Sequence, residues 1–98
     1  MIRWKDSVGF DALHPAIVLA LIRADHIYAS LEGVDCWVTS LNDSRHMEGS
    51  LHYTGRAADL RTYNLKDPEA VAAALASALG PSFDVVLESD HLHLEYQP

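Results

Sequence analysis

The sequence predicts a small α+β domain, in which a short antiparallel sheet is flanked by two main helices. Three observations support this fold class. Two stretches, residues 15–31 and 70–79, carry apolar residues at helical spacing. Shorter segments rich in β-branched and aromatic residues lie between and after them, as is typical of strands. The chain has 98 residues, enough for one hydrophobic core, so residues 1–98 are expected to form a single domain.

The first helix is expected to begin at His14-Pro15, because proline suits the first helical position. Gly33 follows as the expected C-cap. One face of this helix carries apolar and aromatic residues in register: Ile17, Leu21, Ala24, Tyr28 and Leu31.

The second helix has signals at both ends. Asp67-Pro68-Glu69 supplies an N-cap, a proline at the first position and an acid in the first turn. The alanine-rich run 70–79 follows, and Gly80-Pro81 ends it.

Four strands are expected. Residues 34–39 and 57–62 form the first two, with a polar, irregular segment at 41–49 between them. Residues 83–87 and 91–96 form the other two, and the short connection between them predicts a hairpin with a tight turn.

Composition excludes several classes of function. Seven basic against fourteen acidic residues give a net charge of −7, which argues against nucleic-acid binding. The longest apolar stretch, residues 16–22, is far shorter than the ~20 residues of a membrane span. Cys36 is the one cysteine, so no internal disulfide forms. The N-terminus lacks the apolar region of a signal peptide, so a cytoplasmic location is expected.

The histidines point to a metal site. Four of the six lie in two polar clusters, one containing His46 and His52 and the other His91 and His93. Imidazole nitrogen and carboxylate oxygen are the usual ligands of a catalytic zinc ion. A glycine-containing turn separates His52 from Asp59 and can bring both to one ion.

The predicted hairpin arranges the second cluster. His91 and His93 alternate along a strand, so both point to the same face. A two-residue turn at Ser89-Asp90 would place Glu88 directly opposite His91 on that face. Two imidazoles and one carboxylate are therefore expected to form a patch on one side of the sheet.

Two segments resemble a known family. The stretch from Ser50 to Leu60, SLHYTGRAADL, is similar to the Ser-x-His-x-x-Gly-x-Ala-x-Asp signature of the zinc D-Ala-D-Ala peptidases. Phage endolysins of the L-alanyl-D-glutamate peptidase type and the Hedgehog signalling domain share this signature. The stretch from Asp90 to Tyr96, DHLHLEY, resembles the family's second segment, which is built around His-x-His.

The resemblance implies a role for each of several residues. One zinc ion per chain would be held by His52, Asp59 and His93. His91 would stabilise the transition state, and His46 would lie beside the zinc site. Arg45 is the candidate for holding the substrate carboxylate, although the segment around it departs from the family's Ser-Gly-Tyr-Arg-like pattern. Apart from the resemblance, Arg61 is expected to be solvated or paired; the alternative is that it shares a face with Asp59 and supports it.

The general base is left open between two carboxylates. Some relatives place it three residues before the last zinc ligand, which is Asp90 here, and others place it further upstream, towards Glu88. The hairpin argument favours Glu88, because it shares the face of the histidines and follows an apolar run expected to desolvate it partly.

The activity implied is hydrolysis of an amide in the peptidoglycan stem peptide, by a monomer that acts on the cell wall if released as an endolysin. Either the D-Ala-D-Ala or the L-Ala-D-Glu bond fits. The alternative is a non-catalytic, Hedgehog-like zinc-binding module. A purely structural zinc site is disfavoured, because such sites generally take four protein ligands, often with cysteine.

Overall fold

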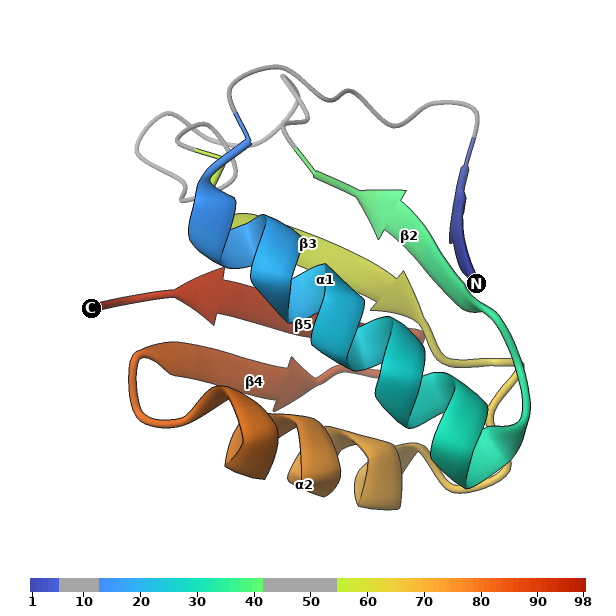
Figure 1. The fold of residues 1–98 in the computed structure, drawn as a ribbon. Coiled ribbons are helices and arrows are strands. Elements are labelled where there is room, and N and C mark those ends of the chain that lie inside the picture. The colour runs from blue at the N-terminus through green and yellow to red at the C-terminus, as the bar shows by residue number, and fades with distance from the viewer. Residues whose placement is uncertain (6–12, 42–54) are drawn as a thin grey trace.

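A computed structural model describes residues 1–5, 13–41 and 55–98 and confirms the α+β fold (Figure 1). Within these ranges, two α-helices and five strands follow the order β1, α1, β2, β3, α2, β4, β5, with a π-helical turn after α1. None of the described helices has the length and apolar character needed to span a membrane.

The five strands form one mixed sheet with the order β1-β2-β3-β5-β4. Its members are β1 (Ile2–Trp4), β2 (Cys36–Ser40), β3 (Ala57–Arg61), β4 (Phe83–Leu87) and β5 (His91–Tyr96). The pairs β2–β3, β3–β5 and β4–β5 are antiparallel, whereas β1 pairs with β2 in parallel. The sequence did not predict β1, because three residues are too few for a recognisable alternation. Because β1 is parallel to β2, the sheet is mixed and not purely antiparallel.

Both helices have the predicted caps. Helix α1 (Pro15–Ile27) begins after His14, whose Nδ1 accepts a 3.0 Å hydrogen bond from the Ala16 N–H. The π-helical turn Tyr28–Glu32 continues it to Gly33, which has a left-handed φ of 67°. Helix α2 (Pro68–Leu79) begins after Asp67, whose side chain accepts a 3.1 Å bond from the Ala70 N–H. His14 therefore has a structural role.

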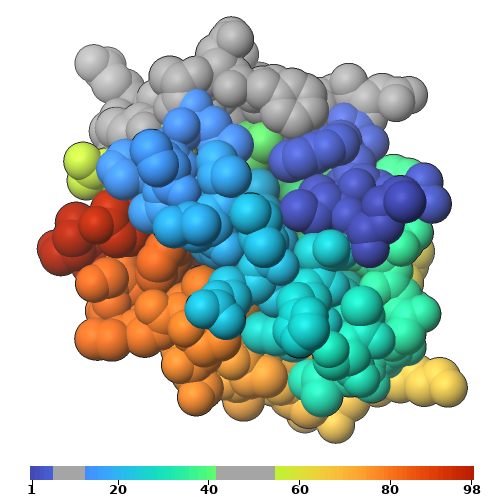
Figure 2. Space-filling view, viewed as in Figure 1, coloured from blue at the N-terminus to red at the C-terminus, as the bar shows by residue number. Residues whose placement is uncertain are grey.

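The helices cover one face of the sheet. Figure 1 shows α1 and α2 on the same side of the strands, and in Figure 2 their side chains hide much of the sheet from that side. Alternate strand residues point into the core between these layers, including Val38, Leu60, Leu92 and Leu94, which are all fully buried. Because strand side chains alternate between faces, the intervening residues of β3 and β5 lie on the face away from the helices.

The hairpin has the predicted register. Leu87 pairs with Leu92, and the Glu88 N–H donates a 2.8 Å hydrogen bond to the His91 carbonyl. Ser89 and Asp90 therefore form the turn, and Glu88 lies opposite His91.

Candidate metal centre

Two neighbouring strands bring the candidate ligands together. In the β3–β5 pairing Asp59 lies directly opposite His93, and Arg61 lies opposite His91. All four residues belong to the face of the sheet that α1 and α2 leave uncovered. The side chains of Asp59 and His93 are only 15% and 18% exposed, and His91 is 31% exposed.

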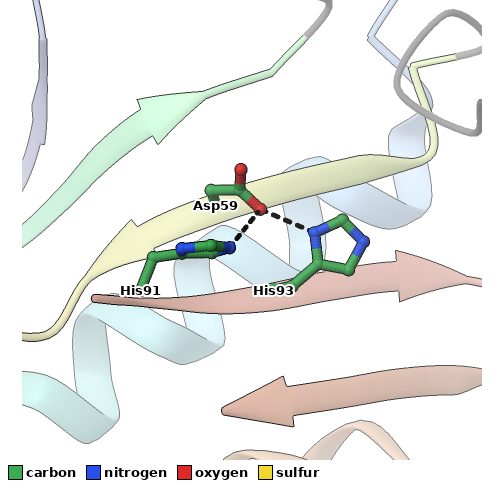
Figure 3. Close-up of side chains that lie close together, drawn as sticks. All are labelled: Asp59, His91 and His93. Carbon is green, nitrogen blue, oxygen red and sulfur yellow. Dashed lines mark hydrogen bonds and ion pairs between the residues drawn. The ribbon is translucent and has the colours of Figure 1, made fainter. Parts of the chain in front are cut away.

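The three side chains converge on one point (Figure 3). His93 Nδ1 lies 2.6 Å from Asp59 Oδ1, and His91 Nε2 lies 3.8 Å from the same oxygen. One ligand atom from each residue lies within 4.8 Å of the other two. Ligand atoms around a single zinc ion are roughly 3–4 Å apart, given bonds of about 2.0–2.2 Å. Asp59, His91 and His93 are thus close enough to hold a metal ion.

Each histidine also contacts a second carboxylate. His93 Nε2 lies 2.5 Å from Glu95 Oε1, and His91 Nδ1 lies 2.6 Å from Asp90 Oδ1. A histidine that binds a metal usually donates its other ring N–H to a carboxylate, which fixes the orientation of the ring. Sequence reasoning missed Glu95 in this role. The alternation His-x-His-x-Glu is the signal that would have found it.

The carboxylates change the proton affinity of the site. The hydrogen bond that His93 donates to Asp59 raises the pKa of His93 to about 9; burial opposes this shift, and the hydrogen bond to Glu95 adds to it. The hydrogen bond from His91 lowers the pKa of the Asp90 carboxyl. Without a metal, His93 is therefore an imidazolium held between two carboxylates at neutral pH.

We expect the chelator-treated protein to lose stability between pH 6.5 and 9.5. The pKa of His93 rises on folding from 6.5 to about 9, so its contribution is fully present below pH 6.5 and is lost as the pH passes through 9. The contribution is on the order of 3 kcal/mol. Zinc must displace this proton, so zinc affinity should rise with pH over the same window.

Thermal melts of chelator-treated wild type and His93→Gln, at the two ends of the window from pH 6.5 to about 9.5, provide the test. The N-terminal amine, which pairs with Asp25 at 2.7 Å, titrates in the same direction. Only the difference between the two proteins therefore reports on His93. His26→Gln changes an exposed helix residue and should behave as wild type. An equal pH dependence in wild type and His93→Gln would contradict the ion-pair arrangement.

The other predicted residues divide into two groups. Arg45, His46 and His52 lie outside the described residues. Glu88 and Asp90 are described and both are exposed. The partial desolvation expected for Glu88 is wrong, because Glu88 is exposed and its apolar neighbours Val85 and Leu87 point to the opposite face of the sheet.

A cleft of about 360 Å³ opens beside the three candidate ligands. Asp59 and His91 form part of its wall, and Asp90 lines it from the turn, whereas Glu88 does not. Further wall residues come from β2, from the end of β3 and from the chain that follows it, among them Thr39, Arg61 and Tyr63. A ligand in this cleft would reach the candidate metal position directly.

The chain was compared with known proteins. No family description matches it, and no curated protein is significantly similar to it.

Proposed function

We propose that this chain is a zinc-dependent peptidase that hydrolyses an amide bond in the peptidoglycan stem peptide. The observation that carries the proposal is the convergence of Asp59, His91 and His93 beside an open cleft. Asp59 belongs to the first of the two segments that resemble the zinc D-Ala-D-Ala peptidases, and the histidines belong to the second. Their meeting in space is what a shared metal site requires.

The donor set fits zinc. Two imidazoles and one carboxylate are characteristic of catalytic zinc sites, which keep one position for water. Cysteine is the ligand more often used in structural zinc sites, but Cys36 is fully buried among the core residues, and burial raises the pKa of its thiol to about 12. A catalytic site is therefore favoured over a structural one. In this proposal the three zinc ligands are His52, Asp59 and His93, as the resemblance implies, and His91 acts on the substrate and not as a ligand.

A zinc ion held here would supply an activated water and polarise the scissile carbonyl. The protein must then accept a proton from the nucleophile and deliver it to the leaving amine. Asp90 is suited to this task, because its carboxylate lines the cleft and its lowered pKa keeps it ionised at neutral pH. Glu88 lies on the correct face but outside the cleft wall. The contacts thus favour Asp90 over Glu88, the reverse of the preference drawn from the sequence.

His91 is suited to stabilise the oxyanion. Its Nδ1 is bonded to Asp90, which orients the ring with Nε2 towards the site. When the ring is protonated, Nε2–H can donate a hydrogen bond to the oxygen that becomes negative in the transition state. When the ring is neutral, with its proton on Nδ1, the lone pair on Nε2 is instead available as a metal ligand.

Mass spectrometry of muropeptides tests the proposal. Incubation of peptidoglycan with the zinc-loaded protein should release new fragments, whose masses identify the bond that is cut. A chelator should abolish their formation, and added zinc should restore it. Stoichiometric zinc without any fragments would reject the peptidase and favour the non-catalytic, Hedgehog-like binding module.

A further inference from the structure

One wall of the cleft carries an exposed aromatic ring. Tyr63 lies in the turn after β3, where the Leu65 N–H donates a 2.9 Å hydrogen bond to the Thr62 carbonyl. The Tyr63 side chain lines the cleft, and 77% of the residue is exposed to solvent. A ring in this position offers an apolar surface to a molecule that enters the cleft.

Neighbouring groups hold this ring in place. The guanidinium carbon of Arg61 lies 4.5 Å from the centre of the Tyr63 ring and 4.5 Å from the centre of the Trp37 ring. Such contacts between a cation and an aromatic face are attractive. The adjacent Asn64 side chain donates a 3.1 Å hydrogen bond to the Asp35 carbonyl, which ties the turn to the segment before β2. The ring is therefore ordered before a ligand binds, and this lowers the entropic cost of binding.

The rest of the cleft wall is polar and carries both signs of charge. Two hydroxyls, two carboxylates and two cations line it, namely Thr39, Ser40, Asp59, Asp90, Lys5 and Arg61. Because opposite charges share one wall, the cleft lacks the single sign of potential that concentrates an ionic ligand. Hydroxyl groups both donate and accept hydrogen bonds. A neutral ligand rich in hydroxyls can therefore pair with all of these groups.

A sugar ring combines the two properties that this cleft requires. Its hydroxyls suit the polar wall, whereas the C–H groups on one side of the ring form an apolar surface. The hydrogens of these C–H groups are slightly positive, and the face of an aromatic ring is negative. A sugar stacked on Tyr63 is thus complementary to the ring in both shape and charge.

The spacing along β3 indicates which part of the stem peptide lies at the metal centre. Arg61 lies two residues from Asp59 on the same face, about 7 Å away, and Tyr63 stacks on Arg61. In peptidoglycan a lactyl group joins the stem peptide to N-acetylmuramic acid. The lactyl group and L-Ala separate this sugar from the L-Ala–D-Glu bond by about 7 Å in an extended chain. The D-Ala–D-Ala bond is three residues, about 10 Å, further away.

We propose that Tyr63 stacks against the N-acetylmuramic acid ring that carries the stem peptide and thereby presents the L-Ala–D-Glu bond to the candidate metal centre. This inference rests on the proposed peptidase function and selects one of its two candidate bonds. Tyr63 is a substrate-binding residue in this arrangement and takes no part in the chemical step.

Two ligands that lack the L-Ala–D-Glu bond test the sugar subsite. N-acetylmuramoyl-L-Ala is the product of the proposed cleavage, and O-methyl-D-lactoyl-L-Ala has the same carboxylate but no sugar. Affinity for the zinc-loaded protein is measured by NMR titration. We expect wild type to bind the sugar-bearing ligand about 5- to 10-fold more tightly, the scale of one aromatic stacking contact. Tyr63→Ala should reduce this preference to less than about twofold.

Three further variants keep the test decisive. Tyr63→Phe retains the aromatic face without the hydroxyl and should keep the full preference. Tyr63→Leu is apolar and nearer in volume to tyrosine but has no flat face, so it should behave as Tyr63→Ala does. Leu31→Ala shortens a side chain that is 55% exposed on the π-helical turn after α1 and should keep the preference of wild type.

Hydrolysis gives a second readout. Wild type should cleave N-acetylmuramoyl-L-Ala-γ-D-Glu-L-Lys with a KM about 5- to 10-fold lower than that for acetyl-L-Ala-γ-D-Glu-L-Lys. The kcat values should be similar, because a contact made equally in the ground state and the transition state changes KM alone. Tyr63→Ala should remove the difference in KM.

The outcomes separate the two proposals. A Tyr63-dependent preference for the sugar without any hydrolysis would support the subsite and reject the peptidase. Cleavage of the L-Ala–D-Glu bond that depends on neither the sugar nor Tyr63 would overturn the subsite and leave the peptidase standing. Cleavage confined to the D-Ala–D-Ala bond would also overturn the subsite.

Discussion

Replacing Asp59 with alanine should abolish zinc binding and hydrolysis together. Asp59 Oδ1 is the atom at which the two histidines converge, 2.6 Å from one and 3.8 Å from the other. Removing it leaves two imidazoles without the anionic ligand that offsets the charge of the ion. We expect zinc content to fall from one per chain to background, with zinc affinity lowered more than about 10²-fold, because even loss of an outer-shell partner costs 10–100-fold.

Thermal melting with and without zinc provides a second readout. A metal present at 1,000 times its dissociation constant stabilises the native state by about 4 kcal/mol, which raises the melting temperature of a domain of this size by more than about 10 °C. Asp59→Ala should lose this zinc-dependent shift. Asp84→Ala, which removes an exposed aspartate from β4, should retain it. Undiminished zinc in Asp59→Ala would place the metal elsewhere.

The two histidines of β5 are expected to differ. His93→Ala should lose zinc, as Asp59→Ala does, because His93 is the more buried ring and lies opposite Asp59. His91→Ala should keep zinc but lower turnover by about 10²–10³-fold, the usual effect of losing an oxyanion donor. If His91→Ala loses its zinc instead, the ligand set is Asp59, His91 and His93.

The second large effect concerns the general base. Asp90→Asn should lower hydrolysis by about 10²–10⁴-fold, the usual contribution of acid–base catalysis, while zinc content stays at one per chain. The amide keeps the shape of the side chain and one hydrogen-bond acceptor for His91, but it cannot take up the proton. Stopped assays over a pH series, with zinc analysis of each variant, measure both quantities.

Glu88→Gln is the matched comparison. Glu88 lies on the same hairpin and is exposed, but it does not line the cleft, so its amide variant should retain hydrolysis to within about threefold. If instead Asp90→Asn hydrolyses the substrate at a near-normal rate and Glu88→Gln is inactive, the general base is Glu88. That result would agree with the sequence-based preference for Glu88, which shares the sheet face of the histidines.

The local features of this chain followed from the sequence. The N-cap of α2 at Asp67, the left-handed C-cap at Gly33 and the register of the β4–β5 hairpin each depend on residues within a few positions of one another. Capping and turn preferences operate over that range. The alternation of His91 and His93 likewise needed only the period of a strand.

Tertiary structure decided the contacts between distant segments. Asp59 and His93 are 34 positions apart. They lie opposite each other because of the register in which β3 pairs with β5, and a shift of that register by one residue would move Asp59 to the other face of the sheet. The same pairing sets Arg61 opposite His91, and the neighbouring strand β2 supplies the Trp37 ring against which the guanidinium stacks. Periodicity assigns each of these side chains to a face of its own strand. Which strands become neighbours, and in which register, depends on how the whole apolar core packs, and that information is spread over the entire chain.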